Sequence, residues 1–149
     1  MFSAISERNK RRLYIGYYNR LTTPSLPVKF HTSLLMTPKN PDSLTTVKEC
    51  WRYHVVDRSA NGSKDEGHWI FEARKAYSRS SKLAGVVLLG KVPQSVSAED
   101  IETIMKSVPR KATTAEDPSW RCRHWIWNAL DVSLCLASIR DELVLMILH

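Results

Sequence analysis

The stretch "KLAGVVLLGKVPQSVSAEDIETIMKSV" (residues 82–108) decides the fold, because the spacing of its apolar residues changes part of the way along. Residues 82–92 form a continuous apolar run with β-branched members, which predicts a strand buried in the centre of a sheet. Residues 97–108 begin with a serine and two acids, as a capped amphipathic helix does. One stripe of this predicted helix holds its apolar residues: Ile101, Ile104, Met105 and Val108. The chain therefore changes from strands to helices here.

Upstream of residue 82 the sequence has the patterns of four more strands. They cover residues 12–20, 28–38, 48–58 and 68–77. The third alternates with period two, so its residues divide between two faces of a sheet. One face carries Cys50, Arg52, His54 and Val56, and the other carries Trp51, Tyr53, Val55 and Asp57.

Downstream, residues 117–138 predict a second helix, with Asp117 as its cap and Pro118 at its first position. Five strands followed by helices predict an α+β fold, in which a mostly antiparallel five-stranded sheet packs on C-terminal helices. A chain of 149 residues suits one core. We expect residues 1–11 to be a flexible basic arm and residues 12–149 to form a single domain. The apolar tail, 139–149, can make a last helical segment.

The bulk composition is that of a soluble globular protein. Hydrophobic residues make up 43% of the chain and charged residues 25%, and no stretch approaches the roughly 20 apolar residues that span a bilayer. The N-terminal segment has basic residues without an apolar stretch after them, unlike a secretory signal, so we expect a cytoplasmic location. The three cysteines, Cys50, Cys122 and Cys135, include no close pair, which indicates reduced thiols.

The net charge of +7 comes from 22 basic and 15 acidic residues that are spread along the chain. The basic residues form no dense stripe with aromatic residues between them, and no nucleic-acid-binding motif is present, so we do not expect nucleic acid as a partner. A solvated basic surface accounts for this pattern, and attraction of an anionic partner or substrate is the alternative.

The segment "SWRCRHWIWNAL" (119–130) holds a candidate nucleophile, Cys122. This residue lies within the first two turns of the predicted helix and is flanked by Arg121 and Arg123. A helix N-terminus and nearby cations both stabilise the thiolate, which is the reactive form of cysteine. The helical spacing also places Cys122 on an apolar, packed face, so a structural role as a small core residue stands beside the catalytic one.

A cysteine nucleophile needs a histidine base and a third polar group that orients the imidazole. His31 and His54 each lie in the middle of a predicted strand. If these strands are neighbours, the two imidazoles lie side by side on one face of the sheet, and the helix of Cys122 can pack against that face. His124 follows Cys122 by two residues, about 200° around the helix, and points away from it.

Two other interpretations of these residues stay open. A histidine within a strand is often a structural residue rather than a catalytic one. A metal site is a further alternative, with Cys50, His54, Cys122 and His124 as its ligands. Their spacing matches no standard zinc motif, so we predict neither a metal site nor a cofactor site.

Three motifs follow one another in the order His, His, Cys: "FHTSLLM" around His31, "RYHVVD" around His54 and "RCRHWIWNAL" around Cys122. As a set they resemble the lecithin:retinol acyltransferase-like branch of the permuted NlpC-type papain-like superfamily. The resemblance implies a permuted papain-like fold, with His31 as the base, His54 as the orienting histidine and Cys122 as the nucleophile. Arg121 stands where that branch has asparagine. Residues 12–135 are also similar to a group of small fungal proteins.

Two functions follow as expectations. The first is a cysteine-dependent hydrolase or acyl transferase, which forms a thioacyl-enzyme from the amide, ester or thioester of a small molecule or peptide and needs no cofactor. The second is a non-catalytic protein that keeps the fold and binds an anionic partner through its basic surface. The substrate and the oligomeric state are not readable from the sequence.

Overall fold

The computed structural model describes residues 11–22, 29–39, 50–57, 68–76, 80–112 and 116–137. Within these residues, five strands precede two helices. The strands are β1 (Arg11–Asn19), β2 (Phe30–Thr37), β3 (Trp51–Asp57), β4 (Trp69–Lys75) and β5 (Leu83–Val92), and the helices are α2 (Ala98–Lys106) and α3 (Cys122–Ala137). The predicted α+β class and the five-stranded antiparallel sheet are therefore confirmed.

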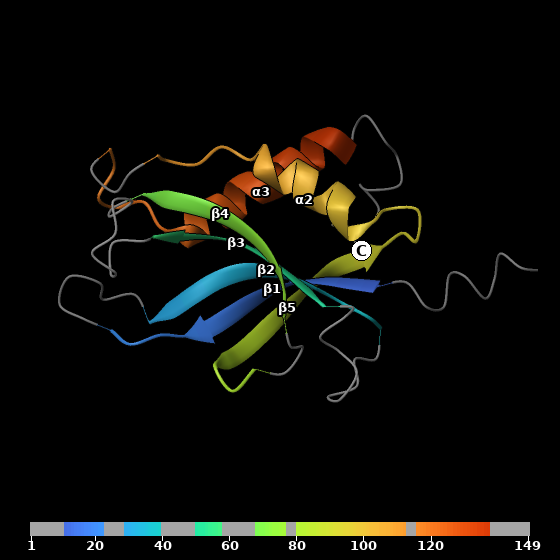
Figure 1. Cartoon of the computed structure of the whole chain (residues 1–149), viewed down its shortest axis with the longest axis horizontal. Coiled ribbons are helices and arrows are strands. Elements are labelled where there is room, and N and C mark those ends of the chain that lie inside the picture. The colour runs from blue at the N-terminus through green and yellow to red at the C-terminus, as the bar shows by residue number, and fades with distance from the viewer. Residues whose placement is uncertain are drawn as a thin grey trace, which may run out of the picture.

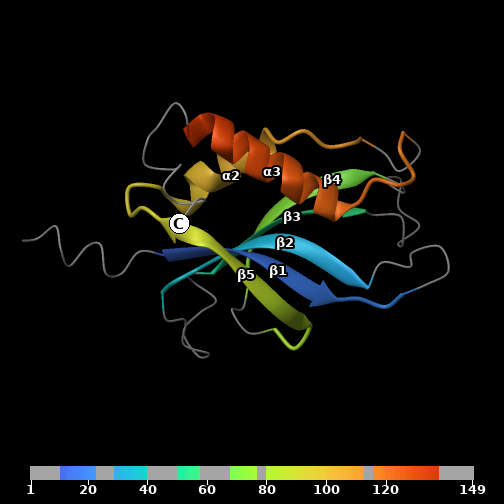
Figure 2. The same ribbon diagram turned by 180° about the vertical axis from the view of Figure 1, so that it is seen from behind.

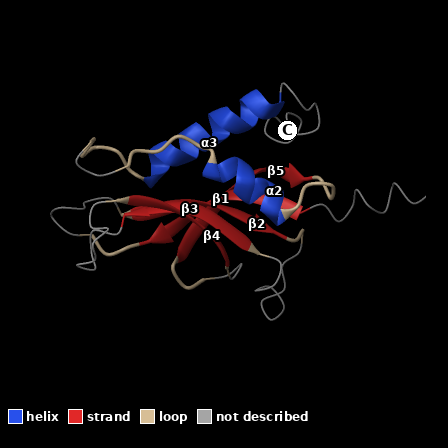
Figure 3. Cartoon of the chain, turned by 45° about the horizontal axis from the view of Figure 1, so that its top comes forward, coloured by secondary structure: helices blue, strands red, loops and turns tan. Residues whose placement is uncertain are grey.

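The strands form one sheet in the order β4-β3-β2-β1-β5, and each strand is antiparallel to its neighbours. Both helices lie on the same side of this sheet (Figures 1 and 3). We call the side that they cover the helix face and the opposite side the far face. The view from behind shows α3 running across the sheet above the level of β2 (Figure 2).

The hydrophobic core lies between the helix face and the two helices. Trp125 of α3 is fully buried and packs on Phe71 of β4, with 5.8 Å between the ring centroids. Tyr53 of β3 donates a hydrogen bond of 3.0 Å from its hydroxyl to the carbonyl of Ala98, which ties α2 to the sheet. Further buried members of the core are Leu13, Leu34, Met36, Val55, Ile101, Met105, Ile126 and Ala129.

The prediction that residues 82–92 form a central strand is wrong. They form β5, which among the described strands pairs with β1 alone and so lies at an edge of the sheet. The exposed fractions of Val86, Val87 and Leu88 are 45%, 50% and 56%. A continuous apolar run indicates that both faces of a strand are apolar, and it does not reveal whether a second neighbour is present.

Helix α2 begins as predicted, with Ser97 as its N-cap. The Ser97 hydroxyl accepts a hydrogen bond of 3.0 Å from the amide of Asp100, and the Asp100 carboxylate accepts one of 2.8 Å from the amide of Ser97. This reciprocal pair is a capping box.

Helix α3 begins at Cys122, later than the predicted start at residue 117. The Asp117 carboxylate caps a turn instead, accepting hydrogen bonds from the amide and the hydroxyl of Ser119. The amide of Arg121 donates a hydrogen bond of 2.8 Å to Nδ1 of His124. A side chain from the first turn of α3 therefore satisfies the amide of the residue just before the helix.

The predicted arm, 1–11, lies outside the described residues except for Arg11, and the predicted tail segment, 139–149, lies wholly outside them. Neither of the two described helices has the length and apolar character that crossing a lipid bilayer requires.

Candidate functional site

The two histidines predicted to lie together do so. His31 of β2 and His54 of β3 approach to 2.7 Å between Nε2 of His31 and Nδ1 of His54, with 5.0 Å between the ring centroids. The ladder between β2 and β3 covers only three residue pairs, the last of which joins Leu34 to Tyr53. The side chains of His31 and His54 therefore meet beyond the end of the β2–β3 ladder.

Glu72 of β4 extends this pair into a chain of three polar side chains. It is the cross-strand partner of His54, and its Oε2 lies 3.3 Å from Nε2 of His54, without the alignment of a good hydrogen bond. Arg74 holds the same carboxylate oxygen at 2.8 Å. A carboxylate favours a protonated Nε2 on His54, which leaves Nδ1 of that ring to accept a hydrogen bond from Nε2 of His31.

Both imidazoles are neutral at physiological pH. Burial, followed by the neighbouring His54 and the guanidiniums of Arg20 and Arg52, lowers the pKa of His31 to about 3. Burial, followed by Arg52 and Arg74, lowers the pKa of His54 to about 3. The surroundings of the pair are therefore cationic, and they disfavour a further positive charge.

Buried polar atoms without a hydrogen-bond partner gather around this pair. Within the described part of the chain they include Tyr18 Oη, Ser33 Oγ, Arg52 Nε and His54 Nε2. We call the set Tyr18, His31, Ser33, Arg52, His54 and Glu72 the histidine cluster. An unsatisfied buried polar group costs about 1–3 kcal/mol, so several in one place indicate a site that is completed by water or by a ligand.

Strand register places the histidine cluster on the far face. Tyr18 is the cross-strand partner of His31, and the Arg52 guanidinium lies over the Tyr18 ring at 5.2 Å from its centroid. Gly16 is the partner of Ser33, and a Cβ on Gly16 would lie 3.0 Å from the Tyr18 ring and 3.5 Å from Ser33 Oγ. Because Gly16 has no side chain, the Tyr18 ring can occupy the space above it.

Cys122 is the first residue of α3 and is only 2% exposed. Its sulfur accepts hydrogen bonds from Thr32, at 3.3 Å from the hydroxyl and 3.5 Å from the backbone amide. Among the described residues, no hydrogen bond links Cys122 to His31 or His54.

The expectation that α3 packs against the face of the histidines is wrong. Thr32 and His31 are consecutive residues of a regularly paired strand, so their side chains leave opposite faces of the sheet. Cys122 meets the Thr32 side chain on the helix face, whereas His31 and His54 meet on the far face. Leu34 and Met36, which share the parity of Thr32, form the apolar surface that receives α3.

The two arginines beside Cys122 differ in their surroundings. The Arg121 guanidinium donates hydrogen bonds to the carbonyls of Pro118 and Trp120, at 2.5 and 2.7 Å, and so it stabilises the turn before α3. Arg123 is exposed. His124 lies against the rings of Trp120 and Trp127 and, as predicted, is turned away from the sulfur.

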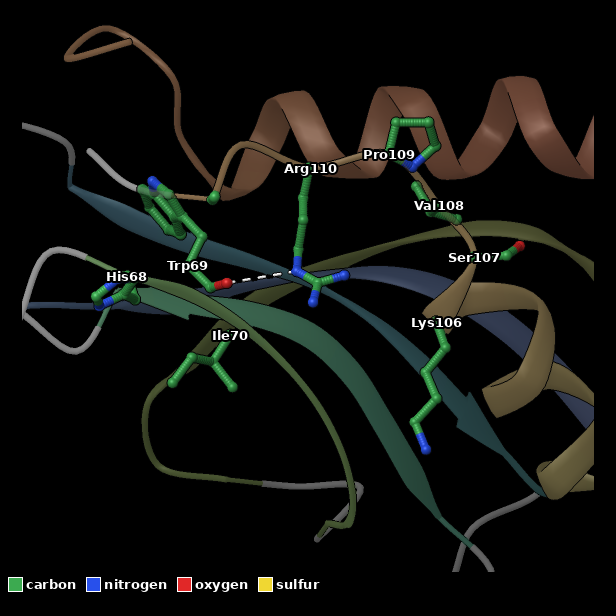
Figure 4. A pocket seen from close by; sticks show the side chains of 9 residues that line it. His68, Trp69, Ile70, Lys106, Ser107, Val108, Pro109 and Arg110 are labelled. Atoms are coloured by element: carbon green, nitrogen blue, oxygen red, sulfur yellow. Dashed lines mark hydrogen bonds between the residues drawn. The ribbon is translucent and has the colours of Figure 1, made fainter. Parts of the chain in front are cut away.

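A separate hollow of about 520 Å³ lies beside β4 (Figure 4). His68, Lys106 and Arg110 line it, and no acidic residue is among its lining residues. Arg110 donates from Nε to the carbonyl of Trp69 at 3.3 Å, which leaves the rest of its guanidinium available (Figure 4). No member of the histidine cluster lines this hollow, so cationic side chains gather at two separate places among the described residues.

Sequence reasoning missed four members of the histidine cluster as functional candidates: Tyr18, Ser33, Arg52 and Glu72. The period-two alternation already put Arg52 on the face of His54, and Glu72 follows the same alternation within 68–77. What brings Glu72 to His54 is the register of β3 against β4, which no local pattern encodes.

Comparison with the curated proteins and with the solved structures gives no match. One family model matches the chain over residues 10–136, a span that includes every described strand and both members of the histidine pair. The chain therefore belongs to DUF6914, a family of unknown function.

Proposed function

We propose that this protein binds a small molecule with a carboxylate or phosphate group on the far face of its sheet, at the histidine cluster. The observation that supports the proposal is the set of buried polar atoms without partners, which come from three adjacent strands and surround the paired imidazoles. Such atoms retain their full capacity to hydrogen-bond a ligand.

The charges around the cluster favour an anion. Arg20 and Arg52 act on His31, and Arg52 and Arg74 act on His54, against the single carboxylate of Glu72. The Tyr18 ring beneath Arg52 orients the guanidinium, and a guanidinium that is already oriented binds a planar oxyanion through two parallel hydrogen bonds. His31 and Arg52 are both partly exposed, so they form the entrance to the cluster.

The experiment is a calorimetric titration of the full chain with inorganic phosphate and, separately, with succinate. We expect at least one of the two anions to bind, and Arg52→Gln to weaken that binding by about tenfold or more, which corresponds to about 1.4 kcal/mol. Tyr18→Phe removes one unpaired hydroxyl, keeps the ring under Arg52, and should weaken binding less.

Arg110→Gln is the matched control, because Arg110 belongs to the other cationic surface. It should leave the affinity unchanged within about twofold. Absence of binding for both anions would contradict the proposal. So would loss of binding in Arg110→Gln with normal binding in Arg52→Gln, since the hollow beside β4 would then be the site.

Cysteine-dependent acyl transfer and the permuted papain-like arrangement stay predictions. Cys122 occupies the first position of a helix, as the resemblance implies, and the His31–His54 pair has formed. The reaction needs the sulfur within reach of a base, however, and the sulfur contacts Thr32 on the helix face. Anion binding at the histidine cluster does not require Cys122 to approach a histidine.

A further inference from the structure

Strand β5 presents an apolar surface that is about half exposed. The run "LAGVVLLG" (83–90) has no charged residue and no proline. Val86, Val87 and Leu88 are each about half exposed, and they alternate between the two faces of the sheet. A strand that is apolar on both faces is typical of a sheet interior, yet β5 has β1 as its one strand neighbour among the described residues.

The opposite edge of the sheet is protected, which makes the exposure of β5 distinctive. Edge strand β4 carries Glu72, Arg74 and Lys75. The amide of Trp69 is bonded to the carbonyl of Ala112 at 3.0 Å, so part of its backbone edge is satisfied by a loop. Charges and loop cover are two of the devices that prevent edge-to-edge association, and β5 has neither over residues 84–90 within the described chain. Bulges are a third device, and the register shifts of β5 against β1 at Ala84 and Leu89 leave residues 85–88 as its regular edge.

We propose that β5 pairs with β5 of a second copy of this chain, in antiparallel orientation, to form a continuous ten-stranded sheet. The edge requires a partner strand that is apolar on both faces, and β5 itself meets that requirement. A two-fold axis through Val87 sets Val86 of each copy opposite Leu88 of the other, with both pairs on the same face. Both copies then place their helices on the same side.

The charges at the ends of β5 are compatible with this pairing. The nearest ones are Lys82 and Lys91. Register shifts against β1 at Ala84 and Leu89 limit the regular part of β5 to residues 85–88, and both lysines lie beyond these shifts. The segment at the centre of the pairing therefore carries no charge, although the chain as a whole carries a net charge of +7.

Sedimentation velocity of the full chain tests the proposal. We expect the wild-type chain to be a dimer at micromolar concentration and Val87→Lys to be monomeric, with dissociation favoured by about tenfold or more, because a central lysine blocks strand addition. Leu88→Lys gives a second, independent variant at the same edge. Trp127→Lys is the matched control: Trp127 is 57% exposed and lies on α3 rather than on the sheet, so the dimer should persist.

Circular dichroism of each variant confirms that it folds, since all three positions are exposed. Hydrogen exchange then locates the contact: the amides of residues 85–88 that point away from β1 should be protected in the wild type and lose that protection in Val87→Lys. A monomeric wild type would overturn the proposal, whether its amides exchange freely or are protected by another segment of the same chain. A Val87→Lys variant that stays dimeric would overturn it as well.

Discussion

His31 and His54 differ from surface histidines because folding buries His54, leaves His31 only partly exposed and places the two rings 2.7 Å apart among arginines. A protonated imidazole in this position would face the second ring and two or more guanidiniums without the hydration that it has in the unfolded chain. The pair is therefore stable only when both rings are neutral. The stability of the whole fold therefore depends on pH through these two histidines.

The free energy of unfolding should fall as the pH falls below about 6.5. The pKa of each histidine is about 3 in the folded state and near 6.5 in the unfolded state, so between these values the unfolded chain binds protons that the native chain excludes. Stability is complete above pH 6.5 and decreases toward pH 3, by up to about 2 kcal/mol per histidine at pH 5. The partly exposed His31 should contribute less. Urea denaturation at pH 7.5 and 5 measures the difference.

His54→Asn should reduce the loss of stability between pH 7.5 and 5, whatever its effect at pH 7.5, because one of the two shifted groups is gone. His68→Asn, at an exposed position, should leave the loss unchanged. Equal losses in wild type and His54→Asn would show that the buried pair does not titrate as described.

At the scale of the element, α3 fixes the environment of Cys122. The residues Cys122, Trp125, Ile126 and Ala129 recur on one side of the helix and are all buried against the helix face. The thiol is thus part of the core surface of α3, in contact with Thr32. The helix N-terminus lies beside the sulfur, but the packing that positions it also encloses it.

Iodoacetamide should modify Cys122 slowly in the native protein. The exposed fraction is 2% for Cys122 and 0% for Cys50, which implies that both thiols react only through local opening of the fold. We expect each to react about tenfold or more slowly in the native protein than in the urea-unfolded chain. Peptide mass spectrometry of timed samples gives the rate for each cysteine, and Cys122→Ser identifies the peptide. Modification of native Cys122 faster than of the unfolded chain would instead support the nucleophile and revive cysteine-dependent catalysis.

At the scale of the whole molecule, the strand positions were predictable because alternation and apolar runs are local signals. The bounds of β1 to β5 lie within three residues of the predicted segments. The edge position of β5 was not predictable, since an apolar run reports the polarity of a strand's faces and not the number of its neighbours. Strand order depends on contacts between residues far apart in the sequence.

The candidate site was predictable only in part, for a similar reason. The His31–His54 pair followed from placing two histidine-bearing strands side by side. The side that receives α3 did not follow, because β2 has apolar residues on both faces, such as Leu34 toward the helices and Leu35 on the other side. A helix stripe shows that a helix packs, without showing which face of a sheet it meets.

The most direct test of the anion site on the far face is a nitrogen-15 spectrum that resolves the imidazoles of His31 and His54, recorded across pH and with added inorganic phosphate or succinate. We predict that both rings are neutral from pH 7.5 to 5, with the proton on Nε2 of each. We also predict that the anion shifts both resonances in the wild type and that Arg52→Gln needs about tenfold or more anion for the same shift. Rings that titrate near pH 6.5, or resonances that neither anion moves, would contradict the account.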